Sequence, residues 1–257
     1  MPTALVNALS FALIPAGVAL VGAVIAAFRE PSPRLRTYIE HFAAGVVAAV
    51  VAAELLPEAV KEKSPLAIAI GFSLGTVSML LIGHFTEGSD GEATDQQPMA
   101  PALPGQLGEA LARGSPMGMI MPVAVDVLID GFLLGLAFVA APKAGILLAV
   151  GFALEMLSLG LATSATCRRR GWSIRRTLLT VLGISLCLVI GAAAAAGLFA
   201  GISGVWLTGV VAFGLAALLY LVTEELLVEA HEVRETHLTT AMFFVGFLAL
   251  LMIDVLS

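Results

Sequence analysis

Eight stretches of the chain are almost free of charged residues, and each has about the 20 apolar residues that a helix needs to cross a bilayer. They run at about 6–28, 41–60, 65–85, 117–139, 143–166, 176–200, 204–228 and 237–256. The pattern predicts an all-α integral membrane protein with eight transmembrane helices. It forms a single transmembrane domain, 1–257, in which 86–115 is the one long link.

The composition excludes an ordinary soluble globular protein. Hydrophobic residues make up 59% of the chain and charged residues only 12%, with a mean hydropathy of +1.01. Globular domains carry about 25% charged residues. The link 86–115 is instead rich in acids, proline and glycine, a composition that cannot bury a core and predicts a flexible cytoplasmic loop. We expect the first stretch to be a retained span, because no basic residue precedes it.

Lysine and arginine predict the orientation of the spans. The links after spans 1, 3, 5 and 7 carry ten of these residues, whereas the opposite links carry three. Because basic residues concentrate in cytoplasmic links, this asymmetry places both termini outside the cell. The Ala, Gly and Arg usage is typical of a multi-pass protein of a bacterial cytoplasmic membrane.

A repeated motif predicts how the spans are grouped. Phe42–Ala59 and Phe213–Ala230 both begin with Phe and end with Glu-Leu-Leu-x-Glu-Ala at the same spacing, and four spans lie between them. The second copy must therefore cross the bilayer in the opposite sense. Spans 1–3 and 6–8 would form inverted repeats around spans 4 and 5, a 3+2+3 arrangement typical of secondary transporters with a substrate site at mid-membrane. Gly71-Phe72 and Gly246-Phe247 extend the match to spans 3 and 8.

Three carboxylates lie half-way along the two central spans. Asp126 and Asp130 share one face of span 4, and Glu155 lies at a similar depth in span 5. An ionised carboxylate at the centre of a bilayer costs about 2.5–3.5 kcal/mol even on insertion scales, and no basic residue is expected at this depth. Two interpretations remain open. The acids hold a cation, or they are protonated and only form hydrogen bonds between helices.

Further acids lie towards the ends of the spans. Glu54 and Glu58 lie near the outer end of span 2, while Glu225, Glu229 and His231 lie near the inner end of span 7. They are either solvated groups of the membrane interface or ion-collecting groups at the two mouths of a transport path. The spacing of the inner group matches no established metal motif.

At this point the chain resembles the ZIP (Zrt/Irt-like) family of divalent metal transporters. The resemblance is carried by Phe42-Ala43-Ala44-Gly45, Leu55-Leu56-Pro57-Glu58-Ala59, Glu225-Leu226-Leu227-x-Glu229-Ala230 and Gly246-Phe247, together with the eight spans and the long link between spans 3 and 4. It implies a homodimer that moves metal ions towards the cytoplasm, without a bound cofactor and without a nucleic-acid partner.

The central motifs depart from those of the family. Where the family has His and Glu in span 4 this chain has Asp126 and Asp130, and where it has His and Pro in span 5 the chain has Glu155 and Ser158. Leu188 replaces an acid that helps some members to bind a second ion. The resemblance therefore implies one metal site formed by the three acids and the Ser158 hydroxyl. Such oxygen ligands favour Mn²⁺, Mg²⁺ or Ca²⁺ over the Zn²⁺ and Fe²⁺ of the family, although zinc also binds carboxylates.

Two other functions compete with transport. The lost Pro and Glu residues of spans 4 and 5 would suit a transport-inactive relative that acts as a sensor or scaffold. A membrane enzyme is disfavoured because the spans contain no nucleophile beside a base, no zinc-hydrolase motif and no phosphate-binding loop.

Overall fold

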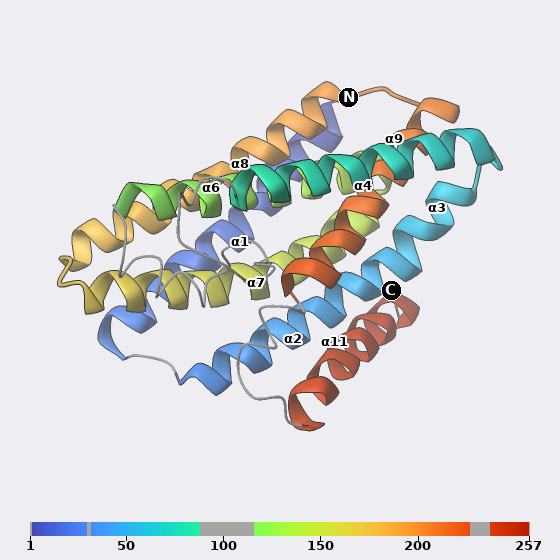
Figure 1. Cartoon of the computed structure of the whole chain (residues 1–257). Coiled ribbons are helices and arrows are strands. Elements are labelled where there is room, and N and C mark those ends of the chain that lie inside the picture. Colours follow the sequence, from blue (N-terminus) through green and yellow to red (C-terminus); the bar gives the residue numbers. More distant parts are fainter. Residues whose placement is uncertain (1, 30–31, 88–115, 227–236, 257) are drawn as a thin grey trace, which may run out of the picture.

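The computed structural model describes residues 2–29, 32–87, 116–226 and 237–256. In these ranges the chain is all helical, and eight helices are long and apolar enough to cross a membrane, as predicted (Figure 1). The helices are α1 (Pro2–Phe28), α2 (Pro33–Val50), η1 (Val51–Leu55), α3 (Leu56–Val60), α4 (Pro65–Glu87), α6 (Pro116–Ala140), α7 (Pro142–Arg169), α8 (Ile174–Leu198), α9 (Val205–Tyr220), η2 (Leu221–Leu226) and α11 (His237–Leu256). The loop predicted at 86–115 falls almost wholly outside the described residues.

Local sequence signals account for where several helices begin. Ser32 and Ser173 accept hydrogen bonds from backbone N–H groups three residues later, at 3.3 Å each, and so cap α2 and α8. Pro33 and Pro142 stand in the first turns of α2 and α7, where a missing N–H costs nothing. As a result span 2 begins at Pro33, well before the 41 that hydropathy alone predicted.

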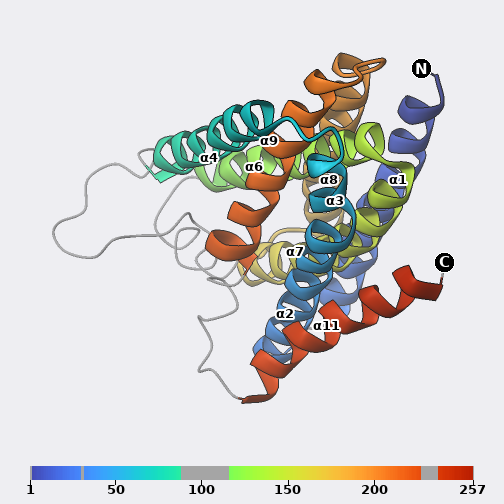
Figure 2. The same cartoon turned by 90° about the vertical axis from the view of Figure 1, so that its right-hand side faces the viewer.

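The long helices pack in pairs that are distant in sequence. α1 lies along α7, α6 along α8, α2 along α11 and α4 along α9. Figures 1 and 2 both show α11 beside α2, at the edge of the bundle. α6 and α7 also contact each other, because Ala141 alone separates them. The two helices that carry the predicted central acids are therefore neighbours.

In both copies of the repeat, a glycine of one helix packs closely against the backbone carbonyl of the Phe that begins the other copy. A methyl group on Gly246 of α11 would overlap the Phe42 carbonyl, and one on Gly75 of α4 would overlap the Phe213 carbonyl. Each glycine lies equally far along the chain from the Phe that begins its own copy. These contacts make Gly75 the counterpart of Gly246 in the repeat. The sequence motif Gly-Phe had instead paired Gly246 with Gly71.

Both copies also contain a π-helical turn at the same place. η1 (Val51–Leu55) interrupts span 2, and η2 (Leu221–Leu226) continues α9. Each turn includes the Glu of the Glu-Leu-Leu motif, at positions 54 and 225. π-Helical turns are rare and are found frequently at functional sites, so the repeat preserves a local backbone irregularity as well as a motif.

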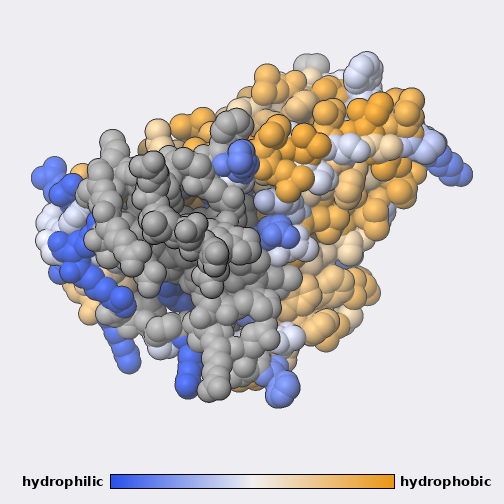
Figure 3. All heavy atoms as spheres, viewed as in Figure 1, coloured by the Kyte–Doolittle hydropathy of each residue, from blue (hydrophilic) through white to orange (hydrophobic). Residues whose placement is uncertain are grey.

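The surface agrees with a membrane environment. Large apolar side chains point outward along the helices; they include Leu13, Val21, Leu74, Ile190 and Phe244, each about half exposed or more. Figure 3 shows hydrophilic residues at the left and right ends of the bundle and a hydrophobic surface over much of its right half. A soluble monomer seldom exposes so large an apolar area.

Gly246→Val is expected to destabilise the protein, because the added side chain must push α11 away from the Phe42 carbonyl. Overpacking of this kind typically costs about 1–3 kcal/mol. The matched control is Gly183→Val, at a helical glycine with no other group within 4 Å of the added carbon. Thermal unfolding in detergent measures both. Equal melting temperatures for the two variants would contradict the close contact between α2 and α11.

Candidate functional site

Asp130 is the most unusual side chain in the described part of the bundle. It lies near the middle of α6 and has no exposed surface. Neither of its carboxylate oxygens has a hydrogen-bond partner among the described residues. An unsatisfied buried polar group costs about 1–3 kcal/mol, and a charged one more. The chain therefore keeps at Asp130 a group that weakens the fold unless something binds to it.

Asp126 and Glu155 are the acidic side chains close enough to influence the charge of Asp130. Asp126 lies one turn earlier on α6 and Glu155 lies on α7, and both are within electrostatic range of the Asp130 carboxylate. Both are half-buried and make further contacts of their own. In the described ranges, no three His, Cys, Asp or Glu side chains are placed to hold one metal ion. The three acids, called the central acids below, are thus neighbours without forming a closed ligand cage.

The polypeptide backbone of α8 packs closely against the part of α6 that contains Asp130. A methyl group on Gly131 would overlap the Leu188 carbonyl, and one on Gly191 would overlap the Leu128 carbonyl. These glycines let α6 and α8 approach closely, as small residues do between membrane helices. Leu188, which we expect to stand where some ZIP transporters have an acid, is fully buried, and its backbone contacts Gly131, the residue after Asp130. The side chain at position 188 offers no oxygen ligand.

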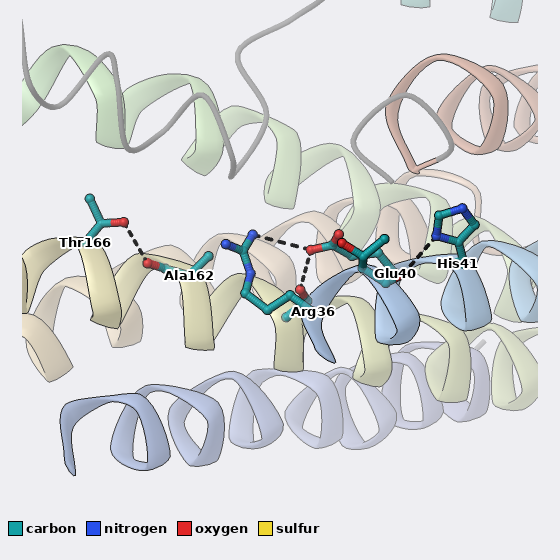
Figure 4. A network of polar contacts seen from close by, with 7 residues as sticks. Arg36, Glu40, His41, Ala162 and Thr166 are labelled. Carbon is teal, nitrogen blue, oxygen red and sulfur yellow. Dashed lines mark hydrogen bonds and ion pairs between the residues drawn. The ribbon is translucent and has the colours of Figure 1, made fainter. Parts of the chain in front are cut away.

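Ser158, predicted as a metal ligand, contacts a fourth acid that the sequence analysis did not single out. Its hydroxyl donates a 2.6 Å hydrogen bond to Oε1 of Glu40 on α2. The Arg36 guanidinium approaches the same oxygen at 3.4 Å. Glu40 is only 4% exposed. Figure 4 shows Arg36 and Glu40 turned toward each other between α2 and α7. Arg36, Glu40 and Ser158 are called the Glu40 network below.

The sequence contains a signal that could have revealed this network. Arg36 and Glu40 are four residues apart, the spacing of an ion pair along a helix. Hydropathy placed both before the start of span 2, so they were treated as link residues. The neighbouring His41 is also buried, and its Nδ1 donates to the Thr37 carbonyl at 2.9 Å (Figure 4).

The two acids predicted at the outer mouth, Glu54 and Glu58, are both held by lysines. Lys143 Nζ lies 3.6 Å from Oε1 of Glu54 and 2.7 Å from Oδ1 of Asp254. Lys61 Nζ lies 3.3 Å from Oε1 of Glu58. Glu54, Lys143 and Asp254, the Lys143 cluster, join η1, the start of α7 and the end of α11. These pairs support the interpretation of Glu54 and Glu58 as interfacial groups. Carboxylates that are paired with lysines are also less available to collect ions.

Lys143→Met is expected to lower the melting temperature, because it leaves the Glu54 and Asp254 carboxylates facing each other without a cation. Lys63→Met, an exposed lysine of the α3–α4 link, is the control for losing one positive charge. Like-charge repulsion at a surface weakens with salt. The difference in melting temperature between the two variants should therefore become smaller at high ionic strength. A difference that does not change with salt concentration would contradict the ion-pair account.

The residues predicted at the inner mouth are only partly described. Glu225 lies in the π-helical turn η2. Glu229 and His231 lie outside the described residues, so their predicted role stays a prediction. Comparison of the whole chain with protein-family models finds no match, and comparison with curated proteins finds none either.

Proposed function

We propose that this protein is a transporter that moves divalent cations across the cytoplasmic membrane, inward, through a carboxylate site at mid-membrane. The observation that carries the proposal is Asp130, fully buried in a membrane-length helix with neither oxygen hydrogen-bonded among the described residues. An ionisable residue inside a membrane is expensive, and marks an ion or substrate path more often than a structural contact. Asp126 and Glu155 add negative charge around it.

In this proposal the spans form two inverted triplets, 1–3 and 6–8, around the pair 4–5. Matched contacts support the arrangement. α2 packs on α11 as its counterpart α9 packs on α4, and α1 packs on α7 as α8 packs on α6. The two π-helical turns and the crosswise glycine contacts add to this symmetry. An axis relating the halves would pass between α6 and α7, which carry the central acids.

The ligand chemistry favours hard cations. The central acids supply carboxylate oxygens and no imidazole, which suits Mn²⁺, Mg²⁺ or Ca²⁺ better than it suits Zn²⁺ or Fe²⁺. The acids do not enclose a metal site in the arrangement described. An ion would draw Asp126 and Glu155 around Asp130, and releasing it would let them separate. Such a rearrangement is what alternating access requires.

The orientation, assembly and localisation remain part of this proposal. The asymmetry of lysine and arginine in the links puts both termini outside a bacterial cytoplasmic membrane. The resemblance to ZIP transporters implies a homodimer and inward movement of the ion.

A panel of ions in proteoliposomes tests the function. Purified protein should take up Mn²⁺ and at least one of Mg²⁺ and Ca²⁺ faster than protein-free vesicles do. Sub-micromolar transport of zinc alone would contradict the preference for hard ions. Background flux for every ion would contradict transport itself.

A second candidate is a transport-inactive membrane protein that senses or scaffolds. One observation favours it: in the described ranges no three ligand groups are placed to hold a metal. This candidate predicts background flux in the ion panel even where a metal binds the protein. Measuring binding and flux on the same preparation separates the two functions.

A further inference from the structure

The Glu40 network contains a largely buried ion pair, in which Glu40 is buried and Arg36 partly exposed, and the fold alone does not explain why it is there. Glu40 and Arg36 lie within the membrane-length segment Arg34–Val60, and Glu40 is 4% exposed. Removing two charges from water is costly, and replacing a buried ion pair with apolar residues is often neutral or stabilising. A pair of this kind inside a membrane span is more easily explained by a function that needs its charges.

The network adjoins the central acids. Ser158 follows Glu155 by three residues on α7, so the two side chains share one side of the helix, about 4.5 Å apart along its axis. Glu155 in turn acts electrostatically on Asp130. Glu155 thus lies on α7 between the Asp130 carboxylate, whose charge it influences, and Ser158, whose hydroxyl contacts Glu40.

Glu40 also lies towards one end of the bundle. It stands in the second turn of α2, which begins at Pro33. By the distribution of basic residues this is the cytoplasmic end. An ion leaving Asp130 inward would meet Glu40 next.

We propose that Glu40 is a further cation ligand on the inward side of the central acids. When no ion is bound there, the Arg36 guanidinium takes the position of the ion beside Oε1 of Glu40. The proposal rests on the transport function proposed above. Arg36 and the Ser158 hydroxyl contact the same oxygen, Oε1. A divalent ion that reaches this oxygen replaces the single positive charge of Arg36 with a stronger one.

The structure explains how Arg36 can yield. Its side chain is 20% exposed and starts in the first turn of α2, so the flexible chain can withdraw towards the helix end while Glu40 stays in place. The return of Arg36 to Glu40 then releases the ion. The pair thus acts as a counter-charge that empties the site.

Three variants test this role by Mn²⁺ uptake into proteoliposomes and by thermal unfolding of the same preparations. Glu40→Gln should lose uptake and also lose stability, because it removes the carboxylate that pairs with Arg36 and accepts the Ser158 hydrogen bond. Arg36→Gln should retain Mn²⁺ binding but release the ion slowly, which lowers the turnover rate and the Mn²⁺ concentration for half-maximal uptake together.

The double variant Glu40→Gln/Arg36→Gln decides between a ligand and a structural pair. It removes both charges of the Arg36–Glu40 pair together, so its melting temperature should return towards that of the wild type. Uptake should stay at least about tenfold below wild type, as expected when a charged contact worth about 1.4 kcal/mol or more is lost. Recovery of uptake together with stability would show a merely structural pair and overturn the inference.

Asp130→Asn, measured alongside, separates this inference from the function beneath it. Loss of uptake in Asp130→Asn with wild-type uptake in the double variant would reject Glu40 as a ligand and leave transport intact. Absence of uptake in the wild type for every ion would overturn both.

Discussion

Asp130→Asn should reduce divalent-cation uptake into proteoliposomes to the level of protein-free vesicles. The amide has the shape of the carboxylate but neither its charge nor its second acceptor oxygen. A contact with a charged group contributes about 1.5–3 kcal/mol, so its loss weakens ion binding by roughly tenfold to a hundredfold. The neighbours Asp126 and Glu155 are only half-buried and cannot replace a ligand at the centre of α6.

Glu62→Gln is the matched control for this experiment. It also removes one carboxylate, at an exposed position in the α3–α4 link. It should leave uptake close to that of the wild type. Equal uptake by wild type and Asp130→Asn would contradict the proposed site, and equal losses in both variants would show that bulk charge, not Asp130, matters.

The second large effect is on stability in the presence of metal. A ligand that binds only the folded state stabilises it by about 2.7 kcal/mol at a concentration a hundred times its Kd. Saturating Mn²⁺ should therefore raise the melting temperature of the wild type in detergent by several degrees. Asp130→Asn should show little of this rise, because it lacks the buried carboxylate that binds the ion. In the wild type, binding of the ion compensates for the free-energy cost of burying that carboxylate.

This measurement does not require transport, so it also tests the sensor or scaffold alternative. A metal-dependent rise in the wild type without any flux would favour that alternative. An equal rise in the wild type and in Asp130→Asn would mean that the metal binds elsewhere, for example at the Lys143 cluster.

The helical architecture was predictable from the sequence because the constraint behind it is simple. In a bilayer every backbone polar group must be satisfied within the segment, so long apolar stretches become helices. All eight predicted spans appear as helices of spanning length. The link of one residue between α6 and α7, at Ala141, keeps these two helices side by side. Asp130, predicted half-way along span 4, lies near the middle of α6 and is buried within the protein.

What the sequence analysis missed was decided by side chains that cross between spans. Glu40 lies just before the apolar stretch that the sequence predicts at 41–60, and only the packing of α2 on α7 reveals that Ser158 reaches it. Lys143 stands beside the link between spans 4 and 5, but its side chain reaches Glu54 and Asp254 on two other spans. The alignment of spans 3 and 8 within the repeat is determined by the backbone contacts of Gly75 and Gly246, and the shared Gly-Phe motif did not predict it. Hydropathy contains none of these contacts.

Anomalous X-ray scattering from crystals grown with Mn²⁺ tests the central claim most directly. The account predicts a peak between α6 and α7, within coordination distance of the Asp130 carboxylate and with oxygen ligands from Asp126 or Glu155. Density at the protein surface alone, with Asp130 still buried and without a metal beside it, would contradict the account.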